Sequence, residues 1–238
     1  TRTATHVDHI WKPLFGTGRV DERGRWTRQY RRVLLGVHRA FGKSQLAAVL
    51  LMTVVTMEPV RNGVYGIIAD GKTNTTQVKN YIKAMIETNP TLKAVWKVNK
   101  DEIINRETGQ EIHVYPYKES AVQSRHYVVL ICDEVHMWRD DAVWNGAVSG
   151  AAKIRNALLI GITTAGSSRD GFLFKLYRKL KADTRAYVCW LGISDSDKVT
   201  DRRSWKKITA AGRVTMEELE EQYEGGSLAS FERYYLNR

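Results

Sequence analysis

The sequence has few of the features that mark secreted, disulfide-linked or membrane proteins. Only two of its 238 residues are cysteine, Cys132 and Cys189. Both lie in apolar, strand-like runs, so we expect buried thiols in a reducing compartment rather than a disulfide or a metal site. The longest apolar stretch, residues 46–57, is interrupted by threonines and is too short to span a bilayer. No signal-peptide pattern is visible, and because the first residue is Thr1 rather than Met, we expect a cropped or processed chain.

Internal repeats and low-complexity tracts are also missing from the sequence, while its charge is strongly one-sided. The length is enough for one α/β domain, or for a domain with a small appendage, and the 43% hydrophobic content is enough for a core. The net charge is +11, and residues 1–40 carry nine basic against three acidic side chains. A polyanionic partner is expected, and nucleic acid is favoured because phosphate contacts by Lys and Arg release counterions. A solvated basic surface is the alternative.

The triplet Gly42-Lys43-Ser44 lies between a strand-like run, residues 33–36, and a helix-like run, residues 46–55. A strand, a turn with exposed N–H groups and a helix N-terminus together form a phosphate-binding loop. In such a loop Lys43 would reach the β- and γ-phosphates, and the Ser44 hydroxyl would ligate Mg²⁺. The simpler alternative is that Ser44 only caps a helix.

Two further segments follow in the order that such an ATP site requires. The buried strand expected over 127–134 ends in Asp133 and Glu134, which would hold the Mg²⁺ shell through water and polarise the attacking water. The run 158–166 is expected to be another buried strand that ends in two hydroxyls, Thr163 and Thr164, a position that suits a γ-phosphate sensor. A capping carboxylate pair and an ordinary Thr turn are the alternatives, but the three segments in sequence favour one site.

The rest of the chain alternates strand-like and helix-like segments, which predicts a mostly parallel sheet with helices on both faces. A Gly/Arg-rich loop is expected over 16–28, and a helix capped by Thr75 or Thr76 is expected to stop at residues 89–90. The other expected strands are 33–37, 64–69, 95–98, 103–104, 112–115 and 187–193. The other expected helices are 43–57, 140–152, 172–180, 201–210, 215–224 and 227–236. All three motifs fall at carboxyl ends of strands, where active residues gather.

Taken together, these residues resemble the large terminase subunits of tailed double-stranded-DNA bacteriophages, and the resemblance runs over almost the whole chain. Its motifs are residues 13–16, 39–44, Ala69 with Gln77, 132–138, 162–166 and 231–237. Two positions depart from the family pattern. Val37, preceded by Gly36, stands where the common phosphate loop has glycine. No adenine-reading Gln occurs in residues 1–12, and Gln29 is a weak substitute.

The resemblance implies a RecA-like P-loop ATPase over residues 1–193, followed by a helical lid or linker, 194–238, that leads towards an absent nuclease domain. ATP and Mg²⁺ are the implied cofactors, Glu134 and Lys43 the implied catalytic residues, and Thr164 the coupling residue. The implied metal ligands are Ser44 and Asp133. The implied nucleotide-binding residues are Arg39, Ala40, Phe41, Gly42, Lys43, Ser44 and Gln45. No acidic cluster for two-metal DNA cleavage follows Tyr187, so nuclease activity is not expected.

Family members work as rings, so an arginine from a neighbouring subunit is expected to complete the site. Arg125 is our choice because it precedes the Asp-Glu strand in a turn, and Arg39 could contact the γ-phosphate in cis. The competing candidates for the finger are Arg139, Arg155 and Arg169, and a plain surface role for Arg125 is the alternative. Packing or loop roles are expected for His38 and His136, and core or subunit contacts for Trp138 and Trp144.

The implied partners are double-stranded DNA, further copies of the chain, the portal protein and the small terminase subunit, with no membrane. The implied location is the cytoplasm of the infected bacterium, docked on the procapsid portal and absent from the mature virion. A helicase-like DNA-dependent ATPase is one alternative, although about 70 residues after the Thr-Thr segment are too few for a second motor lobe. A non-catalytic DNA-binding or scaffold protein is the other, and the retained Lys43, Ser44, Asp133 and Glu134 argue against it.

Overall fold

The structure of the chain is a computed structural model that describes residues 7–100, 102–122, 125–211 and 214–238. It divides into two compact units. Unit 1 holds the described residues of Thr1–Lys43, Val135–Arg139 and Ile162–Arg238, and unit 2 holds those of Ser44–Glu134 and Asp140–Gly161. No helix in the described part of the chain combines the length and the apolar character needed to cross a membrane.

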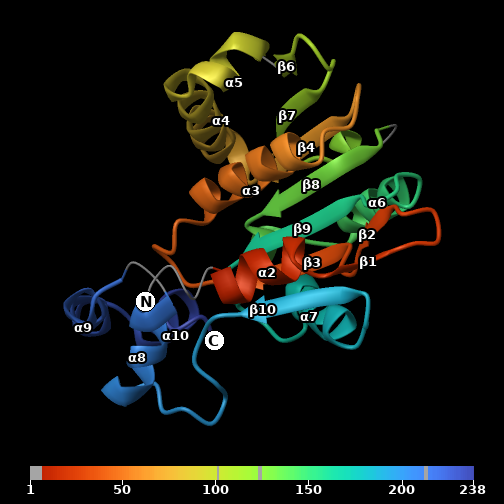
Figure 1. The fold of residues 1–238 in the computed structure, drawn as a ribbon. Coiled ribbons are helices and arrows are strands. Elements are labelled where there is room, and N and C mark those ends of the chain that lie inside the picture. Colours follow the sequence, from red (N-terminus) through yellow and green to blue (C-terminus); the bar gives the residue numbers. More distant parts are fainter. Residues whose placement is uncertain (1–6, 101, 123–124, 212–213) are drawn as a thin grey trace. The chain divides into compact units, whose positions relative to one another are not determined.

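Unit 1 begins with a π-helical turn, η1 (Val7–Trp11), and a short helix, α2 (Lys12–Phe15). Strands β3 (Arg32–Gly36) and β10 (Ala186–Trp190) then pair in parallel, with Gly36 opposite Trp190. Helix α7 (Phe172–Lys181) packs on both strands and buries Leu173, Leu176 and Leu180 (Figure 1). This apolar i, i+3, i+7 stripe is what predicted the helix. Strand β3 and helix α7 are both confirmed.

The expected loop over 16–28 is wrong, because it contains an antiparallel hairpin, β1 (Gly18–Val20) and β2 (Trp26–Arg28). The Asp21 carboxylate accepts hydrogen bonds from the backbone N–H groups of Arg23 and Arg25, and Gly24 takes a positive φ of 71°. An Asp that bonds its own turn followed by a left-handed Gly closes a hairpin. Because arginine also occurs in this turn, the sequence pattern did not indicate a hairpin.

Three helices near the end of the chain surround a hydrophobic cluster of their own. They are α8 (Arg202–Ala211), α9 (Met216–Gly225) and α10 (Leu228–Tyr234), as expected from the sequence. Trp205 and Phe231 lie at the centre of the cluster with ring centroids 5.0 Å apart, and the Trp205 Nε1–H donates to the carbonyl of Val199. Thr215 and Glu218 form a capping box that begins α9.

Unit 2 contains most of the parallel strands. Strand β4 (Val64–Ala69) pairs in parallel with β8 (Tyr127–Asp133) and β7 (Glu111–Pro116). β6 (Ile103–Asn105) pairs antiparallel with β7 and with β5 (Trp96–Val98), and β9 (Leu158–Thr163) lies next to β8 in the strand order. All seven residues of β8 are buried, which explains its unbroken apolar sequence.

The helices of unit 2 cover these strands. They are α3 (Lys43–Met57), whose first residue belongs to unit 1, α4 (Gly71–Thr88), α5 (Pro90–Val95) and α6 (Ala142–Ala151) (Figure 1). α4 packs on β4 and β7, and α6 packs on β8. Helix α3 has the predicted bounds, and the antiparallel strands before β8 are confirmed.

Two expectations about unit 2 need correction. Helix α4 begins at Gly71 with Asp70 as its N-cap, not at Thr75 or Thr76. The Thr75 and Thr76 hydroxyls donate to the carbonyls of Gly71 and Lys72 inside the helix, so the threonine run does not require a loop. The helix does end before Pro90, but the Asn89 side chain then accepts hydrogen bonds from two N–H groups and starts α5, which the sequence reading missed.

The last expected strand, 187–193, is too long, because β10 ends at Trp190. Just after it, a Cβ on Gly192 would lie 2.6 Å from the carbonyl oxygen of Asn237. The chain therefore leaves the sheet where the tail of the molecule packs against it.

Candidate functional site

The glycine-lysine-serine segment is a tight loop that joins β3 to α3. Ala40 and Gly42 both take positive φ angles, 64° and 89°. Left-handed residues turn successive N–H groups to one side, which creates a concavity that favours anions. Such a conformation is strained for Ala40, and strain of this kind is found mainly at functional sites. At its start, the loop is tied to β9 by a hydrogen bond from the Val37 N–H to the carbonyl of Thr163, at 2.8 Å.

The seven predicted loop residues differ in exposure. Arg39 and Ala40 are exposed, Phe41 and Lys43 are buried, and Gly42, Ser44 and Gln45 are intermediate. Lys43 keeps 9% of its surface in contact with solvent. An ammonium group that is nearly enclosed at a helix N-terminus is suited to an anionic ligand.

His38 is fully buried inside the loop. Its Nδ1–H donates to the carbonyl of Arg39 at 2.6 Å, and its ring packs edge-on against Phe41. Nε2 has no hydrogen-bond partner among the described residues. Burial, aided by the charge of Lys43, lowers the pKa of His38 below its usual value, although the bond to Arg39 opposes the shift. The imidazole is therefore neutral and stabilises the conformation of the loop, in line with the loop role expected for it.

In unit 2 the Ser44 hydroxyl contacts the carboxylate of Asp133, the last residue of β8. Ser44 Oγ donates to Asp133 Oδ2 at 3.1 Å, and the Glu134 N–H donates to Asp133 Oδ1 at 3.0 Å. Asp133 is fully buried, and Glu134 has a positive φ of 53°. Residues 89 positions apart thus place a hydroxyl and a carboxylate oxygen side by side.

This pair fits the magnesium ion that the phosphate loop implies. Hydroxyl, carboxylate and water oxygens are the ligands that Mg²⁺ takes, at distances of about 2.0–2.1 Å in an octahedron. Two neighbouring ligands of such an ion are about 3 Å apart by that geometry. The Ser44 and Asp133 oxygens already have that separation.

The two threonines at the end of β9 are held within unit 1. Thr163 Oγ1 accepts a hydrogen bond from the His136 N–H at 3.0 Å and donates to the carbonyl of Thr164 at 2.8 Å. His136 Nδ1 lies 3.3 Å from the Thr164 hydroxyl. Both threonines are buried. The sequence predicted a packing or loop role for His136, and its ring contacts Thr163 as well as Thr164, the predicted coupling residue.

Sequence reasoning missed two residues beside this segment, Arg233 and Asn237. Their side chains bind the two backbone groups of Ala165, the residue that follows Thr164. The likeness of residues 231–237 to a family motif marked the region. Nothing in the motif showed which side chains face the sheet.

Arg125, the predicted finger, is exposed and lies in unit 2 beside β7; its neighbour Ser124 is outside the described residues. Arg125 Nη1 is 3.2 Å from His113 Nε2, and the guanidinium lies 5.7 Å from the centre of the Tyr115 ring. The competitors Arg139, Arg155 and Arg169 are exposed as well. Exposure alone does not decide which of these four arginines is the finger.

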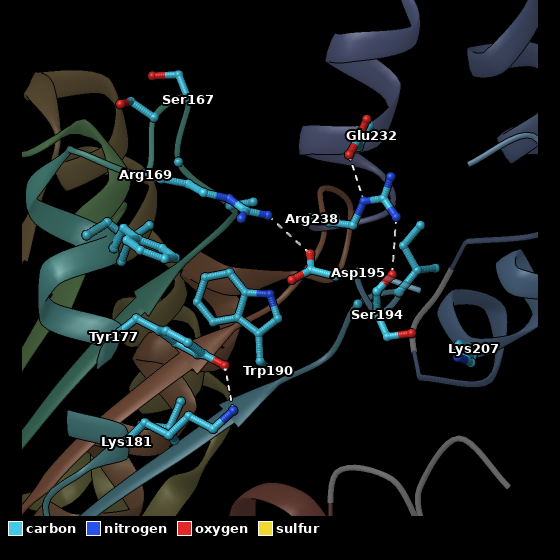
Figure 2. A pocket seen from close by; sticks show the side chains of 18 residues that line it. Ser167, Arg169, Tyr177, Lys181, Trp190, Ser194, Asp195, Lys207, Glu232 and Arg238 are labelled. Carbon is cyan, nitrogen blue, oxygen red and sulfur yellow. Dashed lines mark hydrogen bonds and ion pairs between the residues drawn. The ribbon is translucent and has the colours of Figure 1, made fainter. Parts of the chain in front are cut away.

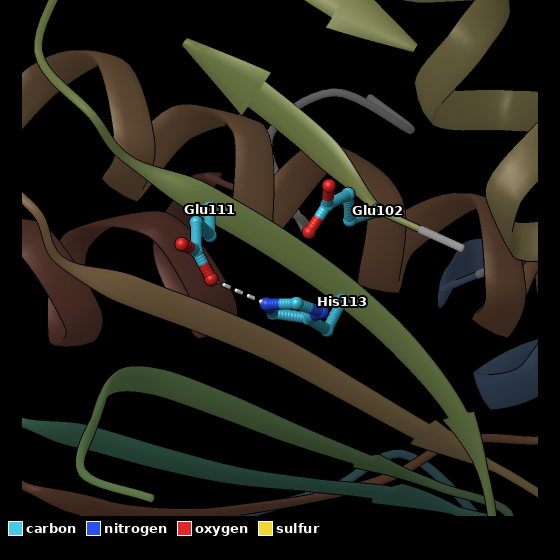
Figure 3. A group of neighbouring side chains, drawn as sticks. All are labelled: Glu102, Glu111 and His113. Atoms are coloured by element: carbon cyan, nitrogen blue, oxygen red, sulfur yellow. Dashed lines mark hydrogen bonds and ion pairs between the residues drawn. The ribbon is translucent and has the colours of Figure 1, made fainter. Parts of the chain in front are cut away.

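The same histidine belongs to the one cluster of the described residues whose side chains could hold a metal ion: Glu102, Glu111 and His113 (Figure 3). Glu111 Oε2 is 2.8 Å from His113 Nε2, the nitrogen that Arg125 also approaches. A guanidinium beside the cluster repels a second cation. These residues are therefore poor metal ligands, and they are distinct from the predicted Mg²⁺ ligands.

A cavity of about 710 Å³ opens in unit 1 beyond Ala165, at the end of β10 (Figure 2). Its aromatic wall includes Tyr177 and Trp190, whose ring centroids are 5.2 Å apart. Most of its charged side chains form ion pairs, Arg169 with Asp195, Arg238 with Glu232, and Lys207 with Asp197. Lys181 instead donates a hydrogen bond to the Tyr177 hydroxyl. Neither Lys43 nor Asp133 lines it, so it is not the predicted phosphate site.

The buried cysteines and tryptophans also follow the sequence reading. Cys132 and Cys189 are free and buried, and burial raises the pKa of both thiols, that of Cys189 to about 11. Trp138 stacks on Phe172, and Trp144 is buried in α6.

A mostly parallel sheet flanked by helices, with a Gly-Lys-Ser loop between the first long strand and the helix that follows, defines an α/β protein of the phosphate-loop class. A family model described as the terminase large subunit, ATPase domain, matches residues 13–182. The chain therefore belongs to the family of terminase large subunit ATPase domains.

One curated protein and two solved structures are similar to the chain. The terminase large subunit of Lactococcus phage p2 is 24% identical over 206 residues, which cover 81% of this chain and 37% of that protein. The crystal structure of the HK97 bacteriophage large terminase matches with a TM-score of 0.77 at 19% identity, over 88% of this chain and 47% of that one. A large terminase from a thermophilic bacteriophage, solved in complex with ADP, matches with a TM-score of 0.62 at 11% identity, over 96% and 52%.

These comparisons confirm the predicted α/β fold and the predicted family. The chain spans less than about half of the length of the p2 and HK97 proteins that it matches.

Proposed function

We propose that this chain binds ATP with Mg²⁺ at its Gly-Lys-Ser loop and hydrolyses it. The observation that carries the proposal is the contact between Ser44 Oγ and Asp133 Oδ2, which presents two magnesium-type ligands next to the phosphate loop. The ADP complex of the terminase from the thermophilic bacteriophage supports a nucleotide as the ligand.

In this proposal most of the catalysis is positioning and charge stabilisation, as in other phosphoryl transfers. Lys43 neutralises the β- and γ-phosphates, and Arg39, Ala40, Phe41, Gly42 and Gln45 complete the nucleotide-binding loop. Ser44 and Asp133 hold Mg²⁺, which when bound would neutralise charge on the phosphate oxygens. Glu134 orients the attacking water and accepts its proton.

Two further residues complete the reaction in the same proposal. Thr164 senses loss of the γ-phosphate, because its buried hydroxyl lies at the end of β9, whose last residue bonds the start of the phosphate loop. Arg125 of a neighbouring copy stabilises the transition state, and such a finger is worth about 10³–10⁵ in rate.

We propose that the hydrolysis drives double-stranded DNA into a procapsid, as the family suggests. The net charge of +11 supports a polyanionic partner. The chain would work as a ring of copies docked on the portal protein in the cytoplasm of the infected bacterium, together with the small terminase subunit, and would be absent from the mature virion. Residues 1–193 would form the motor and 194–238 a helical lid, whose three helices share the hydrophobic cluster from Ile193 to Leu236 within unit 1.

The decisive experiment is ATP hydrolysis by the wild type and by Glu134→Gln, with and without double-stranded DNA and over a range of protein concentrations. We expect the variant to lose on the order of 10²–10⁴-fold in kcat, as for a general base, while it still binds nucleotide. The exposed Glu107→Gln is the matched control and keeps the wild-type rate.

No hydrolysis by the wild type at high protein concentration would contradict the proposal and favour a scaffold. DNA strand separation that accompanies hydrolysis would favour a helicase.

A further inference from the structure

Both backbone groups of Ala165 are bound by side chains from the end of the chain. The Ala165 N–H donates to Asn237 Oδ1 at 2.7 Å, and the Ala165 carbonyl accepts from Arg233 Nε at 3.1 Å. Ala165 is itself buried and directly follows Thr164. Ala165 therefore cannot shift relative to these two side chains without breaking a hydrogen bond.

Asn237 is itself held in place by burial and by hydrogen bonds. It is fully buried, and its positive φ of 53° is a conformation that asparagine tolerates better than most residues. Its Nδ2 donates to the carbonyl of Leu191 at 3.0 Å, and its own carbonyl accepts from Trp190 Nε1 at 2.8 Å. One side chain therefore links the segment after β9 to the segment after β10.

The same stretch of chain also contacts the phosphate loop. The Arg39 N–H donates to the carbonyl of Tyr234 at 2.6 Å. The guanidinium groups of Arg39 and Arg233 lie 5.4 Å and 4.7 Å from the centre of the Tyr234 ring. Arg39 belongs to the predicted nucleotide loop, so residues 233–237 touch both segments of unit 1 to which the proposed function assigns phosphate contacts.

From these contacts we infer that Asn237 is a positioning residue for ATP hydrolysis. It holds the backbone after Thr164 in place. Together with Arg233 and Tyr234 it transmits the effect of nucleotide binding and hydrolysis to helix α10. The inference rests on the proposed function, since it requires that a nucleotide binds at the phosphate loop.

Space for such a movement lies directly beside these residues. Ala165, Gly192 and Arg238 all line the cavity of Figure 2. Packed protein interiors resist small displacements, whereas a segment that borders an open cavity can move as a unit. A shift of Ala165 would therefore pull Asn237 and the end of α10 with it.

The test is amide hydrogen exchange of the whole chain without nucleotide, with Mg-ADP and with a non-hydrolysable Mg-ATP analogue. In the wild type we expect nucleotide to slow exchange at least about three-fold both in peptides of the phosphate loop and in peptides covering 228–238. In Asn237→Ala we expect protection at the phosphate loop to remain and the response of 228–238 to disappear.

Asn62→Ala is the matched control. Asn62 also has a positive φ, 55°, but is exposed and far along the chain from these contacts. It should respond to nucleotide as the wild type does. In steady-state kinetics, Asn237→Ala should lower kcat on the order of ten-fold or more with little change in KM, because a small misplacement affects the reacting geometry more than binding.

A response of 228–238 that persists in folded Asn237→Ala would overturn the inference and leave the proposed function intact. Absence of protection at the phosphate loop of the wild type would overturn the proposed function and the inference with it. Should Asn237→Ala fail to fold, Arg233→Ala removes the bond to the Ala165 carbonyl together with the contact between the guanidinium and the Tyr234 ring, and it must still weaken the response of α10. An unchanged response in that folded variant would also refute the inference.

Discussion

At the scale of single residues, the pairing of Ser44 with Asp133 has energetic consequences even before nucleotide binds. A fully buried carboxylate is costly unless each oxygen has a donor. Here the Ser44 hydroxyl serves one oxygen and the Glu134 N–H serves the other. The sequence predicted both residue types and their roles from motif order. It could not predict the 3.1 Å contact, because that depends on how residues 89 positions apart are brought together.

Ser44→Ala tests this contact. We expect the variant to lose at least about 100-fold in Mg²⁺-dependent ATP hydrolysis, and its free energy of unfolding to fall by about 1–3 kcal/mol because a buried acceptor loses its donor. Ser44→Thr keeps a hydroxyl and should retain most of the activity. Steady-state assays at several Mg²⁺ concentrations and urea unfolding check both effects, with the exposed Ser120→Ala as control. Unchanged magnesium dependence in Ser44→Ala would remove the residue from the metal site.

His38 makes a pH-dependent contribution to the stability of the folded chain. Because its pKa is lowered in the folded chain, below pH 6.5 the unfolded state takes up a proton at this residue that the folded state does not. The contribution of His38 to stability therefore falls as the pH drops below 6.5, until the lowered folded-state pKa is reached, and it is constant above pH 6.5.

We expect His38→Asn, which keeps a donor for the Arg39 carbonyl, to lose less stability than the wild type between about pH 6.5 and 5. The difference in slope is at most about 1.4 kcal/mol per pH unit, the limit for one proton. Urea unfolding at several pH values measures it, with the exposed His126→Asn as control. Parallel curves for wild type and His38→Asn would show that this histidine has no such role.

At the scale of elements, periodicity predicted most strands and helices, including α3 and β4 with their observed bounds. Three of the failures share one cause. The hairpin β1–β2, the start of α4 and the extra helix α5 are decided by side chains that bond their own backbone, namely Asp21, Thr75 with Thr76, and Asn89. Hydrophobic pattern carries no information on such bonds.

Gly36 has a different role in the structure from the one that the sequence motif suggested. The sequence suggested a displaced glycine of the phosphate loop. In the structure Gly36 lies within β3, opposite Trp190, and a Cβ there would lie 2.1 Å from the indole ring. This glycine is thus required for packing between β3 and β10.

Gly36→Ala should destabilise the chain by about 3 kcal/mol, because overpacking forces the ring or the strand to move. Thermal or urea unfolding measures the loss. Gly225→Ala, at a position where nothing lies within 4 Å of the added Cβ, is the control and should be neutral or slightly stabilising. Equal stability of the two variants would mean that Trp190 repacks without cost.

At the scale of the whole molecule, the proposed motor requires more than one copy of the chain. The position of Arg125 in the sequence made it our candidate finger, but a sequence holds no information on which surface meets a neighbour. Within its own unit the guanidinium lies beside His113 and Tyr115.

Mixing two inactive variants tests whether Arg125 acts on a neighbour. Arg125→Ala keeps its own site, whereas Glu134→Gln lacks a working site but can lend its arginine. We expect each alone to lose on the order of 10³-fold in ATP hydrolysis, and the mixture at high protein concentration to exceed the sum of the two rates clearly.

The exposed Arg106→Ala is the matched control and should hydrolyse ATP at the wild-type rate. A mixture no faster than its components would assign Arg125 to its own subunit or to structure. Wild-type activity of Arg125→Ala would move the search to Arg139, Arg155 and Arg169.

The two buried thiols make the chain convenient for spectroscopy. Both are enclosed and largely protonated at neutral pH, so neither Cys132 nor Cys189 should react readily with maleimide dyes. A cysteine introduced on the surface, for example Met137→Cys at a side chain that is 54% exposed, would then be the one reporter that takes up label. Fluorophores could be attached at chosen positions without first removing native cysteines, and the steps of the proposed ring followed one subunit at a time.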